Sequence, residues 1–202
     1  GEQSAEEFEH YGLATLLCKH VTVKKDAVEF DYPAKHGVQR TVEIDDPEVV
    51  RAVRSLMRRT ERTERLLVCR SGNSGWVDVK ADDLNTRFKE LVGEEFTVKD
   101  LRTWHGTVLA AAAFAAAKPP TSKTAIKRET SAVMKEVSGE LGNTPAVARA
   151  SYVDPRVVTG YENGLTIAAA TKRADGMRDL DKAQELMEKA TRQLIRRVAK
   201  RK

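Results

Sequence analysis

Alternating hydrophobic and polar residues near the start of the chain predict a small antiparallel sheet. Between Thr22 and Ile44 apolar side chains recur at every second position, a spacing that puts them on one face of a strand. Two polar segments, Lys24-Lys25-Asp26 and Pro33-Ala34-Lys35-His36-Gly37, interrupt this pattern and are typical of turns. We therefore expect strands joined by hairpins, with Lys35 at the tip of the second hairpin.

Helical patterns account for most of the remaining chain. Asp46-Pro47 is typical of a helix start, with Asp as the N-cap and Pro in the first turn. Further helices are predicted from Lys80 to Gly93 and from Thr97 to Lys118, and Pro119-Pro120 ends the second of them. Leu66 to Cys69 is predicted to be a short buried strand between the helical regions.

The last part of the chain, residues 177–202, has the pattern of a basic amphipathic helix. Its apolar residues recur at spacings of three and four, which places them along one helix face: Leu180, Ala183, Met187, Ala190, Leu194 and Val198. The helix ends in a run of Arg and Lys. This run fits a solvated helix terminus, where cations are favoured, and it fits a contact with a DNA backbone equally well.

Composition narrows the class of protein only modestly. The 202 residues include 35 Lys plus Arg and 30 Asp plus Glu, so the formal net charge is +5, which suits a nucleic-acid partner without requiring one. Cys18 and Cys69 are far apart and form no CxxC motif, which argues against a zinc ribbon or a disulfide framework. No apolar run approaches the ~18 residues that span a bilayer, so we expect a cytoplasmic protein without a membrane partner.

The residues that carry chemistry are concentrated in two short segments. Tyr152 follows Asn143 by nine positions, and Lys99 and Arg102 lie in Lys99-Asp100-Leu101-Arg102-Thr103-Trp104. A tyrosine can attack a phosphodiester and store its energy as a phosphotyrosyl bond, while arginine can bind two phosphate oxygens and lysine can protonate the leaving oxygen. The chain has no Asp/Glu/His cluster typical of a metal site and no GxxxxGK[ST] loop, so we expect no metal, ATP or other cofactor.

These segments resemble the catalytic domain of type IB DNA topoisomerases from Gly1 to about Thr166. Tyr152 matches the family's nucleophile, Arg102 its second catalytic arginine, Lys35 its general-acid lysine, and Lys99 a second lysine that assists the leaving group. Asn143 falls where other members carry a histidine, which resembles the bacterial branch. An amide can donate a hydrogen bond to a phosphate oxygen but cannot act as a general acid or base, so its role there would be electrostatic.

The resemblance implies a fold, a reaction and a partner. It implies that residues 1–202 form one mainly α (α+β) catalytic domain, with many helices and a small antiparallel sheet near its start. It implies relaxation of supercoiled double-stranded DNA through a 3′-phosphotyrosyl intermediate, by a monomer associated with the nucleoid. It also implies an upstream DNA-clamping domain and a first catalytic arginine before Gly1, because no residue of this chain takes that arginine's place.

Three other functions use some of the same residues. Tyrosine recombinases share the fold and chemistry, but they usually carry His-x-x-Arg where this chain has Lys99-Asp100-Leu101-Arg102, and they usually have His in place of Asn143. A DNA-binding module without catalysis would use the basic helices for phosphate contacts, and a ribonuclease is a more distant alternative. His105, one helical turn after Arg102, is interpreted as a core histidine rather than a phosphate contact, and Trp104 as a packing residue.

Overall fold

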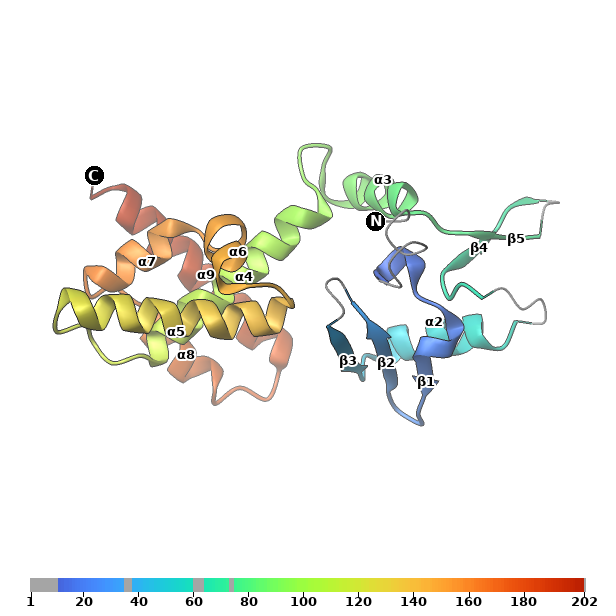
Figure 1. Ribbon diagram of the computed structural model, residues 1–202, viewed down its shortest axis with the longest axis horizontal. Helices are drawn as coiled ribbons and strands as arrows, with labels where there is room; N and C mark the ends of the chain where they lie inside the picture. The colour runs from blue at the N-terminus through green and yellow to red at the C-terminus, as the bar shows by residue number, and fades with distance from the viewer. Residues whose placement is uncertain (1–10, 35–37, 60–63, 73–74, 202) are drawn as a thin grey trace. The chain divides into compact units, whose positions relative to one another are not determined.

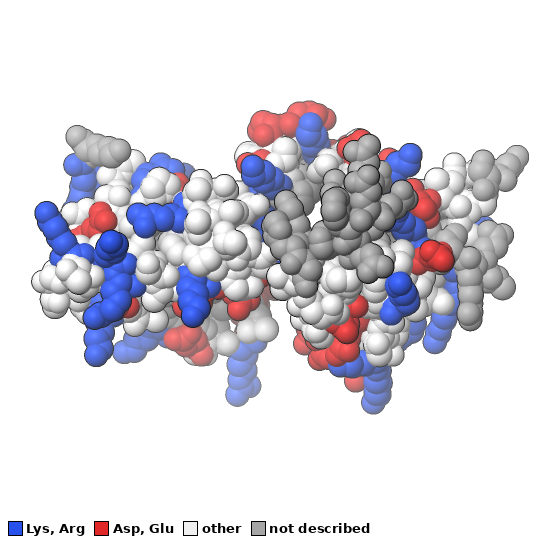
Figure 2. Space-filling view, in the orientation of Figure 1, with Lys and Arg blue, Asp and Glu red and all other residues white. Residues whose placement is uncertain are grey.

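The computed structural model describes residues 11–34, 38–59, 64–72 and 75–201, and the chain divides into two compact units, Gly1–Thr97 and Val98–Lys202 (Figure 1). The expected fold class is confirmed, because the chain is mainly helical with a three-stranded antiparallel sheet near its start. On the face drawn in Figure 2, basic and acidic side chains are interspersed over both units.

The first unit contains the predicted sheet. Its strands are β1 (Val21–Val23), β2 (Val28–Pro33) and β3 (Gln39–Ile44), all antiparallel in the order β1-β2-β3. Phe30 stands opposite Val21 on one side and Val42 on the other. Val28 and Phe30 are buried, as their period-two spacing predicts.

Helix α2 (Pro47–Met57) covers this sheet, and its start follows the predicted capping pattern. The Asp46 carboxylate accepts hydrogen bonds from the backbone N–H groups of Glu48 and Val49, both at 2.9 Å, and Pro47 occupies the first turn. The helix and sheet enclose one core, which consists of Leu16, Val21, Val28, Phe30, Val50, Val53 and Leu66.

The remainder of the first unit differs in part from the prediction. The strand expected at Leu66 to Cys69 begins two residues later, as β4 (Val68–Arg70), and it pairs with β5 (Trp76–Asp78). Only Val68 of β4 is buried, so the expectation of a buried strand is wrong for this segment. A two-stranded ribbon leaves much of both its faces exposed to solvent. The apolar residues that suggested a buried strand include Leu66, which is buried but lies before the strand begins. Two 3₁₀ turns, Leu13–Thr15 and Cys18–His20, precede β1.

The last helix of the first unit is α3 (Ala81–Val92). It ends at Gly93, whose φ of +116° lies in the region that favours glycine. Both ends of this helix agree with the sequence prediction.

The second unit is entirely helical within its described residues. Its elements are α4 (Val98–Ala116), α5 (Lys123–Leu141), α6 (Pro145–Val147), a π-helical turn (Ala148–Tyr152), α7 (Pro155–Glu162), α8 (Ala168–Ala174) and α9 (Leu180–Ala199). None of the described helices combines the length and apolar character that a membrane-spanning segment requires.

Helix α4 is the centre of this unit, since it contacts α5, α7, α8, α9 and the π-helical turn. Its small side chains allow this many neighbours, and Ala110 and Ala111 are completely buried. Phe114 stacks on Tyr161 of α7 with ring centroids 4.7 Å apart, and the Tyr161 hydroxyl donates to the Lys118 carbonyl at 2.8 Å. The helix predicted from Thr97 to Lys118 is thus present as α4 and lies in the core of this unit.

Helix α9 packs on α7 and α8 through the face predicted from its periodicity, with one exception. Ala183, Leu194 and Val198 are buried, but Leu180 is 80% exposed because it occupies the first position of the helix. Thr191, which the apolar pattern omits, is completely buried and donates from its hydroxyl to the Met187 carbonyl at 2.8 Å. A polar residue can occupy this face because that bond satisfies its hydroxyl.

Candidate active site

Tyr152 is the last residue of a π-helical turn that follows the short helix α6. Thr144 caps α6 by accepting from the Val147 N–H, and Pro145 fixes the first turn. The backbone then widens into the π-helical turn and becomes extended at Val153. Single π-helical turns are uncommon in proteins, and those that occur are often found at functional sites.

Helix α4 holds the tyrosine segment through a close backbone contact at Gly106. A Cβ atom added to Gly106 would lie 2.8 Å from the Tyr152 carbonyl oxygen and 3.0 Å from Cδ1 of Leu141. Only glycine allows this approach, because the nearest obstacle is main chain rather than a flexible side chain. Gly106 therefore sets the distance between α4 and the nucleophile candidate.

One threonine hydroxyl connects α4 to the main chain of Tyr152 and of Asp154. The Thr107 Oγ1 donates to the Thr103 carbonyl at 2.8 Å, lies 3.3 Å from the Tyr152 carbonyl oxygen, and accepts from the Asp154 N–H at 3.1 Å. Thr107 is buried, so these bonds are shielded from water. The main chain around Tyr152 is thus fixed by α4, while the phenol is half-buried.

Replacing Gly106 by Ala is expected to lower the free energy of unfolding by about 1–3 kcal/mol, because the added methyl overlaps main-chain atoms of Tyr152. Urea denaturation followed by circular dichroism measures this change. Gly139→Ala is a matched control, since Gly139 lies in α5 with no atom within 4 Å of an added Cβ. There we expect about 0.5–1 kcal/mol of stabilisation. Equal stability changes at the two positions would contradict the close contact.

Arg102 lies one turn before Gly106 on α4 and reaches the tyrosine. The Cζ atom of its guanidinium lies 5.1 Å from the centroid of the Tyr152 ring, within the range of a cation–π contact. Its Nη2 also donates to the carbonyl of Leu141 at the end of α5. The guanidinium is therefore positioned by two segments distant in sequence, and its remaining N–H groups are available to an anion.

Asn143 lies just after the end of α5, two residues beyond Leu141, whose carbonyl accepts from Arg102. Gly142 adopts a left-handed conformation with φ of 62°, and the Asn143 N–H donates to the Ser138 carbonyl at 2.9 Å, which reverses the chain. Both polar atoms of the Asn143 side chain, Nδ2 and Oδ1, are buried without a hydrogen-bond partner among the described residues. The helix cap is Thr144, not Asn143, so the amide has no capping role to explain it.

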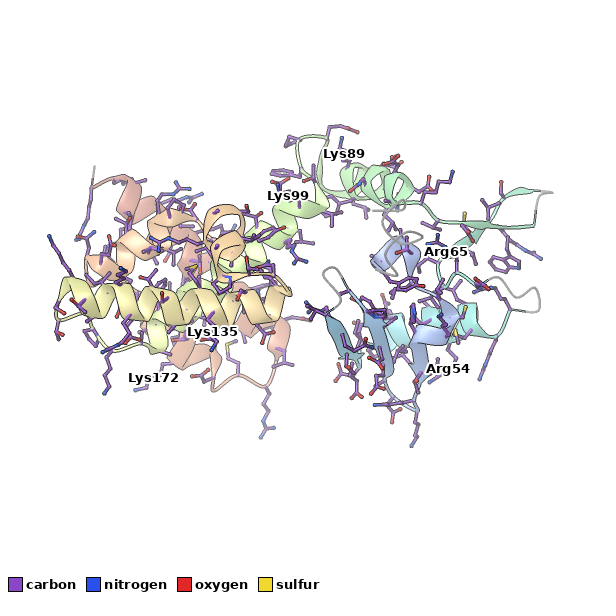
Figure 3. The ribbon with its side chains drawn as sticks, viewed as in Figure 1. Arg54, Arg65, Lys89, Lys99, Lys135 and Lys172 are labelled. Carbon is purple, nitrogen blue, oxygen red and sulfur yellow. The ribbon has the colours of Figure 1, made fainter. Side chains whose placement is uncertain are left out.

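Of the two candidate lysines, only Lys99 lies within the described residues. Lys99 is exposed in the first turn of α4, one helical turn before Arg102 (Figure 3). Lys35 lies outside the described residues, between β2 and β3. The structure therefore places Tyr152, Arg102, Asn143 and Lys99 in the second unit and brings Arg102 into contact with Tyr152.

An ion pair follows the tyrosine directly. Asp154 caps α7 through the Arg156 N–H, and the Arg156 Nε donates to its Oδ1 at 2.9 Å. These bonds from Arg156 lower the pKa of Asp154, so its carboxylate stays charged at neutral pH. Because the pair is internally neutralised, it adds little net charge beside the tyrosine.

Comparison with known proteins tests the family assignment. The family model described as eukaryotic DNA topoisomerase I, catalytic core, matches residues 1–177. The chain belongs to this topoisomerase family. It is also 26% identical over 167 residues to DNA topoisomerase 1B of Acanthamoeba polyphaga mimivirus, an alignment that covers 80% of this chain and 50% of the relative.

The topoisomerase resemblance found in the sequence is thus confirmed at the level of the family. The chain spans about half the length of the viral relative. Assignment to the bacterial branch stays a prediction. Within the described part of this topoisomerase chain, no three His, Cys, Asp or Glu side chains gather as a metal site would need.

One residue of this topoisomerase chain differs from its sequence interpretation. His105 is exposed, so its interpretation as a core histidine is wrong. It lies on the outer face of α4, whereas Gly106 and Thr107 point to the tyrosine segment. Gly106 and Thr107 hold the main chain of Tyr152, and the sequence analysis did not predict this role. The signal that could have indicated a close contact is the Gly-Thr pair inside an Ala-rich helix.

Proposed function

We propose that this chain carries the catalytic residues of a DNA topoisomerase that relaxes duplex DNA through a transient break in one strand. Family membership and the DNA topoisomerase 1B relative support the activity. The observation that carries the chemical assignment is the contact between Arg102 and the Tyr152 ring, because it joins a permanent cation to a nucleophile candidate from a distant segment.

The proposed reaction exchanges one ester for another. The Tyr152 oxygen attacks a backbone phosphorus, a bond forms between them, and the bond from phosphorus to the 5′ oxygen breaks. The phenol proton is lost and the 5′ oxygen gains a proton, so a 3′-phosphotyrosyl bond and a free 5′ hydroxyl result. After the broken strand rotates, the 5′ hydroxyl attacks the same phosphorus and releases the tyrosine. Because bond energy is conserved, the reaction needs no ATP.

Arg102 and Asn143 are proposed to hold the phosphate. Negative charge grows on the non-bridging oxygens in the transition state, and a guanidinium beside the phenol can donate to two of them. The Asn143 amide is buried without a partner, an arrangement that has a cost unless a ligand supplies the missing bond. A phosphate oxygen would accept from its Nδ2.

Lys99 and Lys35 are proposed to protonate the 5′ oxygen, as their match to the family's lysines implies. Lys99 fits this role in one respect, since it is exposed one helical turn from Arg102. We further propose a cytoplasmic enzyme that acts as a monomer on double-stranded DNA, with an upstream domain completing the clamp. No metal or other cofactor enters the proposed steps.

A nicked suicide substrate tests this function. The natural full-length protein is incubated with nicked duplex DNA without ATP or divalent metal, and the products are separated on a denaturing gel. We expect a covalent protein–DNA adduct with a free 5′ hydroxyl on the released fragment, and relaxation of a supercoiled plasmid. Duplex binding without an adduct would overturn the proposal in favour of a DNA-binding module.

A further inference from the structure

An open hollow of about 410 Å³ lies in the second unit, and the catalytic proposal makes no use of it. Three helical segments form it: the start of α5, the π-helical turn and the end of α7. Its volume falls within the roughly 300–1,000 Å³ of typical ligand pockets. The residues that line it are Lys123, Ile126, Lys127, Thr130, Arg149 and Glu162.

The hollow contains a buried hydroxyl without a hydrogen bond. Thr130 is 3% exposed, and its Oγ1 has no partner among the described residues. A helical threonine usually satisfies its hydroxyl by donating to the carbonyl one turn earlier, as Thr107 does on α4. A buried hydroxyl left unpaired is unfavourable, so the exception at Thr130 indicates a missing acceptor.

The charges around the hollow indicate that this acceptor is an anion. Lys123, Lys127 and Arg149 form no ion pair within the described residues, and Glu162 is the one acidic lining residue, so the lining has an excess of two positive charges. The N-terminus of α5 begins at Lys123 and adds the positive end of a helix dipole. Figure 2 shows basic side chains gathered over the part of this unit where α5 begins and α7 ends.

We propose that this hollow binds a phosphate group of the DNA backbone, at a position other than the cleaved phosphodiester. Lys123, Lys127 and Arg149 supply the charge, and the Thr130 hydroxyl donates to one phosphate oxygen. The inference rests on the proposed function, because it takes duplex DNA as the source of the phosphate.

The hollow is also connected to the tyrosine. Arg149 lies in the same π-helical turn as Tyr152, so a phosphate bound by Arg149 holds that turn against α5. This DNA contact therefore fixes the segment that carries the nucleophile as well as adding affinity.

Equilibrium binding of a labelled duplex, measured by fluorescence anisotropy over a range of salt concentrations, tests the proposal. All variants are made in the full-length protein with Tyr152→Phe, so that no covalent bond distorts the equilibrium. The hollow variant is Lys123→Gln with Lys127→Gln. Its control is Lys135→Gln with Lys172→Gln, which removes two lysines of the same unit that do not line the hollow (Figure 3).

We expect the hollow variant to bind the duplex about tenfold more weakly, because it loses hydrogen bonds to a charged group. The slope of log K against log salt should fall in magnitude by about 1, as expected for one lost phosphate contact. Thr130→Val removes only the hydroxyl, so it should weaken binding with the slope unchanged. The control variant should match the parent protein.

The outcomes separate this inference from the proposed function. Equal losses in the hollow and control variants would overturn the inference and show general charge attraction instead. A second arm titrates inorganic phosphate at constant ionic strength and follows the Thr130 amide by NMR. If the Thr130 amide shift saturates with inorganic phosphate while the hollow variant binds duplex DNA as tightly as the parent protein, free phosphate is the ligand. That result would overturn DNA as the source of the phosphate. A parent protein that fails to bind duplex would overturn the proposed function, and with it the DNA source.

Discussion

Tyr152→Phe is expected to abolish the covalent protein–DNA adduct while leaving duplex binding nearly unchanged. The substitution removes the only atom of the side chain that can attack phosphorus. It keeps the ring that packs beside Arg102, and α4 holds this segment through the Tyr152 carbonyl rather than the phenol. The measurement is the suicide-substrate gel, together with anisotropy for binding.

A second tyrosine provides the control for this experiment. Tyr161→Phe removes the hydrogen bond to the Lys118 carbonyl and should lower the free energy of unfolding by about 1 kcal/mol, yet it should form the adduct normally. An adduct that persists in Tyr152→Phe would refute Tyr152 as the nucleophile. Loss of the adduct in both variants would indicate a folding defect instead.

Arg102→Ala is expected to slow single-turnover cleavage by about 10²–10³-fold, the usual effect of removing one preorganised donor from a transition state. Rejoining should slow by a similar factor, because both directions share the same transition state. Quenched time courses on the suicide substrate give the cleavage rate, and release of the adduct by an added 5′-hydroxyl strand gives the rejoining rate.

Arg102 also supports the end of α5 through the Leu141 carbonyl, so a conservative variant is needed beside alanine. Arg102→Lys keeps a cation but loses the planar two-point geometry, and we expect a rate between those of the parent and of Arg102→Ala. Unchanged cleavage in a folded Arg102→Ala protein would contradict the proposed role. Thermal unfolding of both variants shows whether the fold is intact.

Local signals in the sequence were sufficient for most of the secondary structure. The Asp46 cap, the Gly93 stop and the diproline after α4 each act through adjacent backbone atoms, so they could be predicted without knowing the fold. The apolar period of α9 predicted its buried face for the same reason, except at Leu180, where the helix begins and no neighbour covers it.

Features set by distant contacts could not be predicted in this way. The spacing between Asn143 and Tyr152 indicated a shared site, but the unpaired Asn143 amide depends on how α5 ends and on what surrounds it. The prediction that His105 is a core residue was wrong because adjacent positions of α4 lie on different faces. His105 is on the exposed face, and the next residue is on the face that contacts the tyrosine segment. The contact at Gly106 needs the three-dimensional approach of two chain segments.

The way α4 holds residue 152 has a practical consequence for chemical biology. The contacts with Gly106 and Thr107 involve the main chain and Cβ of this residue, so they do not depend on the group at the end of its side chain. Position 152 is therefore a suitable place to install non-natural amino acids. Fluorinated tyrosines would vary the acidity of the attacking oxygen with little disturbance of its support, and a graded series of them would separate nucleophile strength from positioning.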